Sequence, residues 1–257
     1  MRRLSRHERR RGGDHRRLRD PVLKAGRPFD LGLATGNTMI ELYTLLAERF
    51  NREKIDLSHL QTWNLDEYAS DEHHAVPYRH PLSYRRYMDE KLFSLFAPER
   101  GFTSSQAHFP DPADPAAYDR ELEGAGGLDL QLLGIGFNGH IAFNEPLRES
   151  EISVNDYGEL PTRVLPLTPE TIAQNTKVTA NGNASLVPRF AATMGMKPIL
   201  AAKKTLLLAC FAEQTSPLTR MLREKRSTPE LPASYLLGHS DFTLVWTADK
   251  IDLEGLL

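Results

Sequence analysis

Positions 134–146 read GIGFNGHIAFNEP and gather more reactive side chains than a connecting turn requires. Two glycines follow the apolar run LDLQLL, and Asn138, His140 and Glu145 come directly after them. A histidine can exchange a proton near neutral pH. Glu145 can reach back to the imidazole or take a proton itself, and Asn138 can hydrogen-bond the ring and fix its tautomer. The pattern favours acid–base chemistry, although a histidine that only caps a helix is the simpler alternative.

A second candidate turn, ATGNT at 34–38, lies between a short apolar run and a helical pattern. A glycine turn that opens a helix presents free backbone N–H groups and partial positive charge, which together favour a phosphate. The predicted binding residues are Ala34, Thr35, Gly36, Asn37 and Thr38. The turn has neither the Walker pattern nor GxGxxG, so it does not imply a nucleotide. The alternative is a plain tight turn in which Asn37 or Thr38 caps the helix.

The third candidate, NLDEY at 64–68, ends an apolar stretch with two adjacent carboxylates. In an extended chain Asp66 and Glu67 point in opposite directions. Asp66 could therefore enter a crevice, where a carboxylate is a plausible general base, while Glu67 bonds elsewhere. A solvated acidic turn is the alternative that the spacing alone favours.

The elements that must position these turns alternate along the chain. Apolar strand patterns occupy 28–36, 60–68, 128–136, 204–211 and 242–248, and helical patterns occupy 37–50, 81–96, 116–127, 167–177, 196–202 and 216–226. Continuously apolar strands alternating with helices predict an α/β fold: a doubly wound, mostly parallel sheet with helices on both faces, a Rossmann-like three-layer sandwich. Ligands bind such sheets at the carboxyl ends of the strands, so the three turns should converge on one crevice.

Composition narrows the class of protein further. The chain has 257 residues, of which 40% are hydrophobic and 26% charged, with a net charge of −2. We expect no nucleic-acid partner from this charge and no membrane span, because no apolar stretch approaches about 20 residues. With a single cysteine, Cys210, neither a disulfide nor a cysteine metal site is expected. No signal peptide is visible, so the predicted location is the cytoplasm.

The N-terminal segment differs from the rest of the chain. The first twenty residues hold nine arginines and almost nothing apolar. We interpret 1–24 as a disordered segment, or one from an unnatural start site or reading frame, and 25–257 as a single domain. A nucleic-acid-binding arm is the alternative, but the segment has no interleaved aromatic residues.

The three turns together resemble the signature segments of glucosamine-6-phosphate deaminases of the aldose–ketose isomerase type. The matching segments are GLATGNT, NLDEY with the later HPLSY, and GIGFNGHIAFNEP. TMGMKPIL and LPAS are weaker matches, and the resemblance covers about 28–250. The related 6-phosphogluconolactonases share the sheet but have a different amino-acid sequence after the histidine. The resemblance implies the deaminase branch because of Glu145.

The resemblance also implies a role for each matching residue. Asp66 would abstract the C2 proton of the open-chain sugar, and His140 with Glu145 would open the pyranose ring. Asn138 stands where many members have an aspartate that orients the histidine. The implied reaction converts glucosamine 6-phosphate to fructose 6-phosphate and ammonia, with no metal and no organic cofactor.

This sequence departs from the family's phosphate-binding residues at two positions. Lys177 takes the place of an arginine, and Gln214 takes the place of a lysine. Lysine keeps the charge but loses the bidentate fork, whereas glutamine removes the charge. We assign Glu67 and Lys177 to the substrate- and phosphate-binding set, and Arg163, Lys203 or Arg220 could compensate for the lost lysine. The Arg-rich start also replaces the family's first strand and helix, which would leave a sheet edge unpaired.

Several readings stay open at the level of sequence. The main prediction is an enzyme whose partner is a small amino-sugar phosphate, with glucosamine and galactosamine phosphates both possible. The alternatives are a sugar-phosphate lactonase on the same fold and a non-catalytic sugar-phosphate-binding protein, which the change to Gln214 favours. A homo-oligomer is possible.

Overall fold

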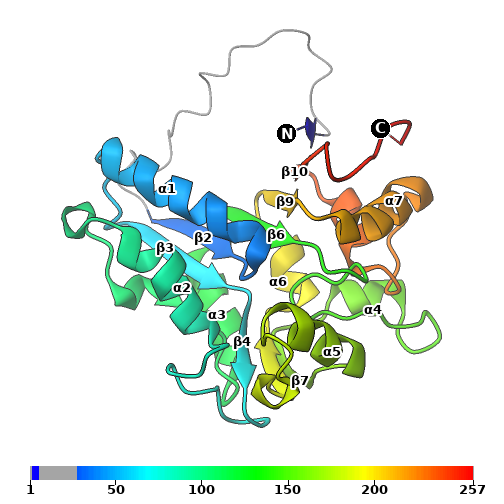
Figure 1. Cartoon of the computed structure of the whole chain (residues 1–257), viewed down its shortest axis with the longest axis horizontal. Coiled ribbons are helices and arrows are strands. Elements are labelled where there is room, and N and C mark those ends of the chain that lie inside the picture. Colours follow the sequence, from blue (N-terminus) through cyan, green and yellow to red (C-terminus); the bar gives the residue numbers. More distant parts are fainter. Residues whose placement is uncertain (1, 6–27, 257) are drawn as a thin grey trace, which may run out of the picture.

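The computed structural model describes residues 2–5 and 28–256 and contains two sheets (Figure 1). The larger sheet has the strand order β1-β10-β9-β6-β2-β3-β5. Its strands are β1 (Arg2–Ser5), β2 (Phe29–Leu33), β3 (Leu60–Asn64), β5 (Ala107–His108), β6 (Leu130–Gly134), β9 (Thr205–Ala209) and β10 (Phe242–Trp246). All neighbours from β10 to β5 pair in parallel, which confirms the predicted mostly parallel α/β sheet.

The described part of the chain contains seven α-helices. They are α1 (Ile40–Arg52), α2 (Tyr84–Lys91), α3 (Pro115–Ala125), α4 (Val154–Gly158), α5 (Pro169–Val178), α6 (Met196–Leu200) and α7 (Thr215–Glu224). From β2 the chain moves outward to β3 and β5, then returns across the sheet to β6, β9 and β10. Because parallel crossovers are right-handed, the helices of these two directions lie on opposite faces, and the sheet is doubly wound.

The switch of direction lies between β2 and β6, which are direct neighbours. The turn that follows β2 contains Thr35–Thr38, and the turn that follows β6 contains Gly136–His140. In doubly wound sheets the ligand crevice forms at this point, outside the carboxyl ends of the strands. The topology therefore brings together two of the three turns that the sequence singled out.

The edge of the sheet next to β10 is not left unpaired. β1 pairs with β10 in the antiparallel sense, so a strand stands where the sequence predicted none. β10 is thereby paired on both sides, and β1 forms this edge of the sheet. The rest of the 1–24 segment lies outside the described residues, and its predicted disorder stays a prediction.

A second, smaller sheet was missed by the sequence reading. Its antiparallel order is β4-β8-β7, with β4 (Asp66–Ala69), β7 (Arg163–Pro166) and β8 (Phe190–Thr193), and it lies beside α5 at the bottom of Figure 1. The stretch 60–68, predicted as one strand, is divided between the two sheets at Leu65. The Leu65 N–H donates to the Leu33 carbonyl of the large sheet, while its own carbonyl accepts from Met194 beyond β8.

This division decides where the third turn points. Asp66 is the first residue of β4, and its register partner on β8 is Thr193. Because the chain changes sheets at Leu65, Asp66 is carried from the end of β3 toward the crevice at the switch point. A single long strand would have carried it past the crevice.

Glu67 has a structural task at the beginning of α2. Its carboxylate is fully buried and accepts hydrogen bonds from the backbone N–H groups of Tyr84 and Arg85, at 2.9 Å each, and from the Ser83 hydroxyl. The first N–H groups of a helix have no partner within the helix, and a carboxylate also complements the helix dipole there. Desolvation raises the pKa of Glu67, while these hydrogen bonds act against the rise.

Most of the buried apolar side chains form one hydrophobic cluster between the large sheet and its helices. A smaller cluster, which includes Tyr68, Phe143 and Ala191, lies under the small sheet. Within residues 2–5 and 28–256, no helix combines the length and the apolar composition that crossing a membrane would take.

Replacing Glu67 with alanine should destabilise the fold. The substitution leaves buried N–H groups at the beginning of α2 without an acceptor, and we expect the free energy of unfolding to fall by roughly 2–4 kcal/mol. Urea denaturation followed by circular dichroism would measure it. Glu90→Ala on the same helix removes only an exposed pair with Arg86 and should leave that free energy nearly unchanged. Equal effects of the two substitutions would contradict the capping role.

Candidate active site

A small cavity of about 240 Å³ lies at the switch point of the large sheet. It is lined by the turn after β2, the turn after β6, Asp66 at the beginning of β4, and one face of α5. Asp66 and His140 both line it, as the sequence predicted from convergence of the three turns. A larger hollow of about 640 Å³ lies elsewhere, lined in part by Phe93, Phe102 and Phe109, and contains neither residue. The smaller cavity is therefore the candidate active site.

The Asp66 carboxyl group is almost completely enclosed. Its exposed fraction is 6%, and its Oδ1 accepts a 2.5 Å hydrogen bond from the Thr193 hydroxyl. The Thr193 hydroxyl accepts in turn from the Phe143 N–H at 3.0 Å, which fixes the direction of its proton. Desolvation raises the pKa of Asp66 to about 7, although the Thr193 hydrogen bond and the charge of His140 act in the opposite direction. A carboxyl group with this pKa is suited to proton exchange near neutral pH.

His140 is paired with Glu145, as the sequence predicted. The imidazole Nδ1 lies 3.3 Å from Glu145 Oε2, and the two side chains are only 18% and 10% exposed. The other oxygen, Oε1, accepts a 2.6 Å hydrogen bond from the Thr171 hydroxyl of α5. Burial alone would raise the pKa of Glu145, but His140, Thr171 and Asn138 outweigh burial and hold it below the usual value. Glu145 is thus held as a carboxylate that faces the imidazole Nδ1 of His140.

The sequence assigned Asn138 to the imidazole ring, and the structure corrects this detail. The Asn138 Nδ2 donates to Glu145 Oε2 at 2.8 Å, and its Oδ1 accepts from the backbone N–H of His140 at 3.1 Å. Asn138 therefore acts on His140 through the glutamate and the backbone. An amide suits this place because it can donate to the carboxylate, whereas an ionised aspartate would repel it.

The turn that holds His140 depends on a glycine beside the ring. A Cβ atom at Gly136 would lie 2.2 Å from His140 Nε2, so the imidazole occupies the space that any other side chain would need. The turn is closed by backbone hydrogen bonds from Gly136 to the His140 carbonyl and from Gly139 to the Gly136 carbonyl. The glycine thus allows the ring to pack over the backbone at the end of β6.

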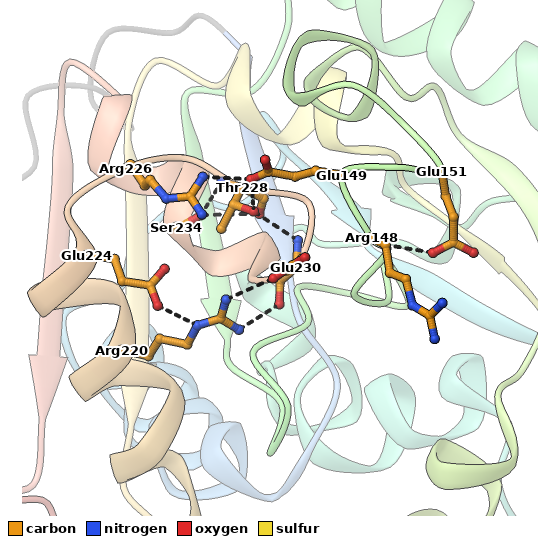
Figure 2. A network of polar contacts seen from close by, with 9 residues as sticks. All are labelled: Arg148, Glu149, Glu151, Arg220, Glu224, Arg226, Thr228, Glu230 and Ser234. Atoms are coloured by element: carbon orange, nitrogen blue, oxygen red, sulfur yellow. Dashed lines mark hydrogen bonds and ion pairs between the residues drawn. The ribbon is translucent and has the colours of Figure 1, made fainter.

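Segment 228–234 supports this turn and the following loop from behind. The Ala233 N–H donates to the Gly139 carbonyl, and the Leu147 N–H donates to the Pro229 carbonyl. Figure 2 shows the polar network at the surface of this contact, where Arg226 and Thr228 both bond Glu149. The loop that carries Glu145 is therefore tied to the end of α7.

The turn after β2 forms the other wall of the cavity. All five predicted residues, Ala34–Thr38, line it. Gly36 has φ 143°, a conformation that favours glycine, and two tyrosines hold the turn: the hydroxyls of Tyr43 and Tyr87 donate to the carbonyls of Ala34 and Gly36. Asn37 and Thr38 do not cap the helix with their side chains, because a short 3₁₀ turn, Asn37–Met39, precedes α1.

Two residues assigned to substrate binding do not line the cavity. Glu67 points away from it and caps α2, as described above. Lys177 is exposed on α5, whose cavity-facing side is formed by Thr171, Asn175 and Val178 at helical spacing. Lys177 lies on a different side of that helix, because it is two positions beyond Asn175 and so is rotated well away from it.

Gln214 and the three possible compensating cations also act elsewhere. The Gln214 side chain is buried and bonds the backbone of Cys210, Phe211 and Ile135. Arg163 bonds Asn144, and Lys203 bonds Asp129. Arg220 lies between Glu224 and Glu230 on the surface (Figure 2). None of these three cations is among the described residues that line the cavity.

Sequence reasoning missed two residues of the site. Thr193 bonds Asp66 across the small sheet, and Thr171 bonds Glu145 from the first turn of α5. The segment TMGMKPIL, which contains Thr193, was a weak match to the family and was the only sequence indication of this residue. Thr171 gave none, because a threonine near a helix start is ordinary. As to a metal, the described residues contain no group of three or more His, Cys, Asp or Glu side chains placed to hold one.

A doubly wound sheet whose switch-point cavity holds a buried carboxyl group and a histidine–carboxylate pair is the architecture of an enzyme that acts on a small molecule. The family described as glucosamine-6-phosphate isomerases/6-phosphogluconolactonase matches residues 16–145. The chain belongs to this family.

Named relatives agree with this assignment. Glucosamine-6-phosphate deaminase 2 of Bacillus subtilis is 34% identical over 229 residues, 87% of this chain and 85% of the relative. Glucosamine-6-phosphate deaminase of Rhodopirellula baltica is 38% identical over 221 residues, 84% of this chain and 80% of the relative. The chain is therefore matched over most of its length and most of theirs.

One solved structure supports the same family, and a second shows the same fold. A monomeric glucosamine-6-phosphate deaminase superposes with a TM-score of 0.72 at 32% identity, over 85% of each chain. The 6-phosphogluconolactonase of Thermotoga maritima has a TM-score of 0.61 at 23% identity, over 88% of this chain and 87% of that one. The second likeness shows the shared fold alone.

Replacing Asp66 with asparagine should stabilise the protein in a pH-dependent way. A carboxyl group whose pKa rises from 3.8 to about 7 on folding favours the folded state less as the pH rises through that interval, because the unfolded chain releases the proton first. At about 1.4 kcal/mol per pH unit, ionisation of Asp66 costs on the order of 4 kcal/mol at pH 8. Asp66→Asn lacks this cost and can still accept the Thr193 hydrogen bond.

Urea denaturation of both proteins between pH 4 and 8 measures this effect. We expect the stability difference between Asp66→Asn and the unchanged protein to grow between pH about 4 and about 7 and to level off above that. If the stability of the two proteins depends on pH in the same way over the whole range, folding does not raise the pKa of Asp66.

Proposed function

We propose that the protein is an aminosugar-phosphate isomerase and deaminase that converts glucosamine 6-phosphate to fructose 6-phosphate and ammonia. The observation that carries the proposal is the buried carboxyl group of Asp66 in the same small cavity as the His140–Glu145 pair. Names of relatives at 34–38% identity support the same activity. The small size of the cavity also suits a single sugar.

In the proposed reaction His140 first moves a proton so that the pyranose ring opens and frees the C1 aldehyde. Glu145 stabilises the imidazolium that forms, and Asn138 and Thr171 hold Glu145 in place. Asn138 is thus a positioning residue, because its side chain bonds Glu145 and the backbone N–H of His140 and does not bond the imidazole ring.

Asp66 then removes the C2 proton, and the electrons form an enolamine across C1 and C2. Return of a proton at C1 gives an imine at C2, and water hydrolyses that imine to the ketone of fructose 6-phosphate with release of ammonia. A positioned general base contributes about 10²–10⁴-fold to such a step. The Thr193 hydroxyl directs one oxygen of Asp66 and leaves the other for the substrate.

The turn at Thr35–Thr38 is proposed to face the phosphate end of the sugar. Its amides and hydroxyls supply hydrogen-bond donors at the wall of the cavity near α1. Location in the cytoplasm, a homo-oligomeric state and the choice between glucosamine and galactosamine phosphates stay predictions.

The proposal is tested by assaying ammonia and fructose 6-phosphate from glucosamine 6-phosphate. Asp66→Asn should abolish both products, because an amide cannot accept the C2 proton, and His140→Gln should reduce them. Glu213→Gln, an exposed change outside the cavity, serves as the control. Binding of the sugar phosphate without product from the unchanged protein would favour a binding protein, and lactonase activity that survives Asp66→Asn would favour the lactonase alternative.

The pH dependence of kcat/KM should show the pKa of Asp66. Because the base must be ionised, we expect kcat/KM to fall about tenfold for each pH unit below about 7. Thr193→Val removes a hydrogen bond that lowers the pKa of Asp66, so the acidic limb should move to higher pH. Steady-state kinetics between pH 5 and 9 measure both profiles, and an acidic limb centred near pH 4 in the unchanged protein would speak against Asp66 as the base.

A further inference from the structure

The phosphate end of the cavity has no cation of its own. Of the described residues that line the cavity, none is a lysine or an arginine, and the ionisable side chains are Asp66, His140 and Tyr84. Asn175, Val178, Thr179 and Phe211 also line the cavity, and all four side chains are neutral. Apart from the His140 imidazole, the hydrogen-bond donors among the described lining residues are amides, hydroxyls and backbone N–H groups.

The Gln214 side chain, which follows β9 in the chain, does not line the cavity. Its Oε1 accepts from the N–H groups of Cys210 at 2.8 Å and Phe211 at 2.9 Å, and its Nε2 donates to the Ile135 carbonyl at 3.0 Å. The side chain is thus fully engaged in closing its own turn and joining it to the end of β6. It also sets the position of Phe211, whose exposed ring forms part of the cavity wall.

A phosphate dianion would be poorly compensated in this cavity. Asp66 must carry a negative charge to act as a base, and the like charge of a phosphate in the same enclosed space disfavours that state. Charge-assisted hydrogen bonds from lysine or arginine are the usual means of offsetting a phosphate. An uncharged hydroxymethyl group meets no such repulsion and can bond the same neutral donors.

We infer that this cavity selects its sugar without recognising charge at C6, and that the protein deaminates 2-amino-2-deoxyhexoses with a free 6-hydroxyl as well as their 6-phosphates. The inference rests on the proposed function, because it assumes the same proton abstraction by Asp66, and it widens the substrate class to unphosphorylated amino sugars. The products are then the unphosphorylated ketose and ammonia.

The test compares kcat/KM for glucosamine 6-phosphate and for glucosamine, with ammonia release as the readout. A hydrogen bond to a charged group is worth about ten- to a hundredfold. In the unchanged protein we therefore expect the phosphate to be preferred by less than about a hundredfold. Gln214→Lys places a cation next to Ile135 and Phe211, which line the cavity, and should raise kcat/KM for the phosphate about tenfold or more.

A second variant covers the case in which Gln214→Lys loses its turn and does not fold. Val178 is 45% exposed and lines the cavity from α5, so Val178→Lys adds the same charge at little structural cost. The matched control is Glu213→Lys, which adds a lysine one position away from Gln214 on the exposed side of the turn. We expect Val178→Lys to raise the preference for phosphate and Glu213→Lys to leave it unchanged.

Two results would overturn the inference while the proposed function stands. One is a preference for glucosamine 6-phosphate above about a hundredfold in the unchanged protein. The other is ammonia release from the phosphate that no added lysine in the cavity improves. Absence of ammonia from both sugars would instead refute the proposed function, and this inference with it.

Discussion

The burial of one carboxyl group, that of Asp66, is the constraint on which the site depends. Taking a carboxylate out of water disfavours its charged form, so an isolated buried aspartate tends to hold its proton. The Thr193 hydroxyl, held by the Phe143 N–H, moderates this tendency and leaves the pKa at about 7. The fold reaches this arrangement by dividing one stretch of chain between two sheets at Leu65, so that Asp66 begins β4 at the cavity that the turns after β2 and β6 also line.

Asp66, Glu145 and Glu67 have different surroundings and hence different roles. Asp66 has one hydroxyl donor and a raised pKa. Glu145 faces an imidazole, a hydroxyl and an amide, and its pKa is lowered. Glu67, the neighbour of Asp66, is enclosed by the backbone at the beginning of α2 and has no access to the cavity. The hydrogen-bond partners of each carboxylate, more than its distance from the cavity, decide its role.

The prediction of the fold and of the central residues succeeded where local signals were strong. Apolar runs and glycine turns indicated the five long strands, and the alternation with helices indicated the parallel sheet. The small sheet was missed because β4, β7 and β8 are four residues each and have no long apolar pattern. The strand β1 was missed because its arginine-rich sequence has no strand pattern, whereas its pairing with β10 satisfies a sheet edge.

The sequence by itself determined which side chains could perform acid–base chemistry, and that the turns after β2 and β6 would meet, because parallel strands end at one edge of the sheet. Only the tertiary structure decided the direction of each side chain. Glu67 and Asp66 are adjacent, but successive side chains of a strand point to opposite faces. Glu67 therefore faces the beginning of α2, and Asp66 faces the cavity. Lys177 was predicted to bind phosphate, but helix rotation turns it away from the cavity, and three hydrogen bonds to the backbone hold the Gln214 side chain outside the cavity as well. Those directions depend on contacts between segments far apart in the chain, which local residue patterns do not record.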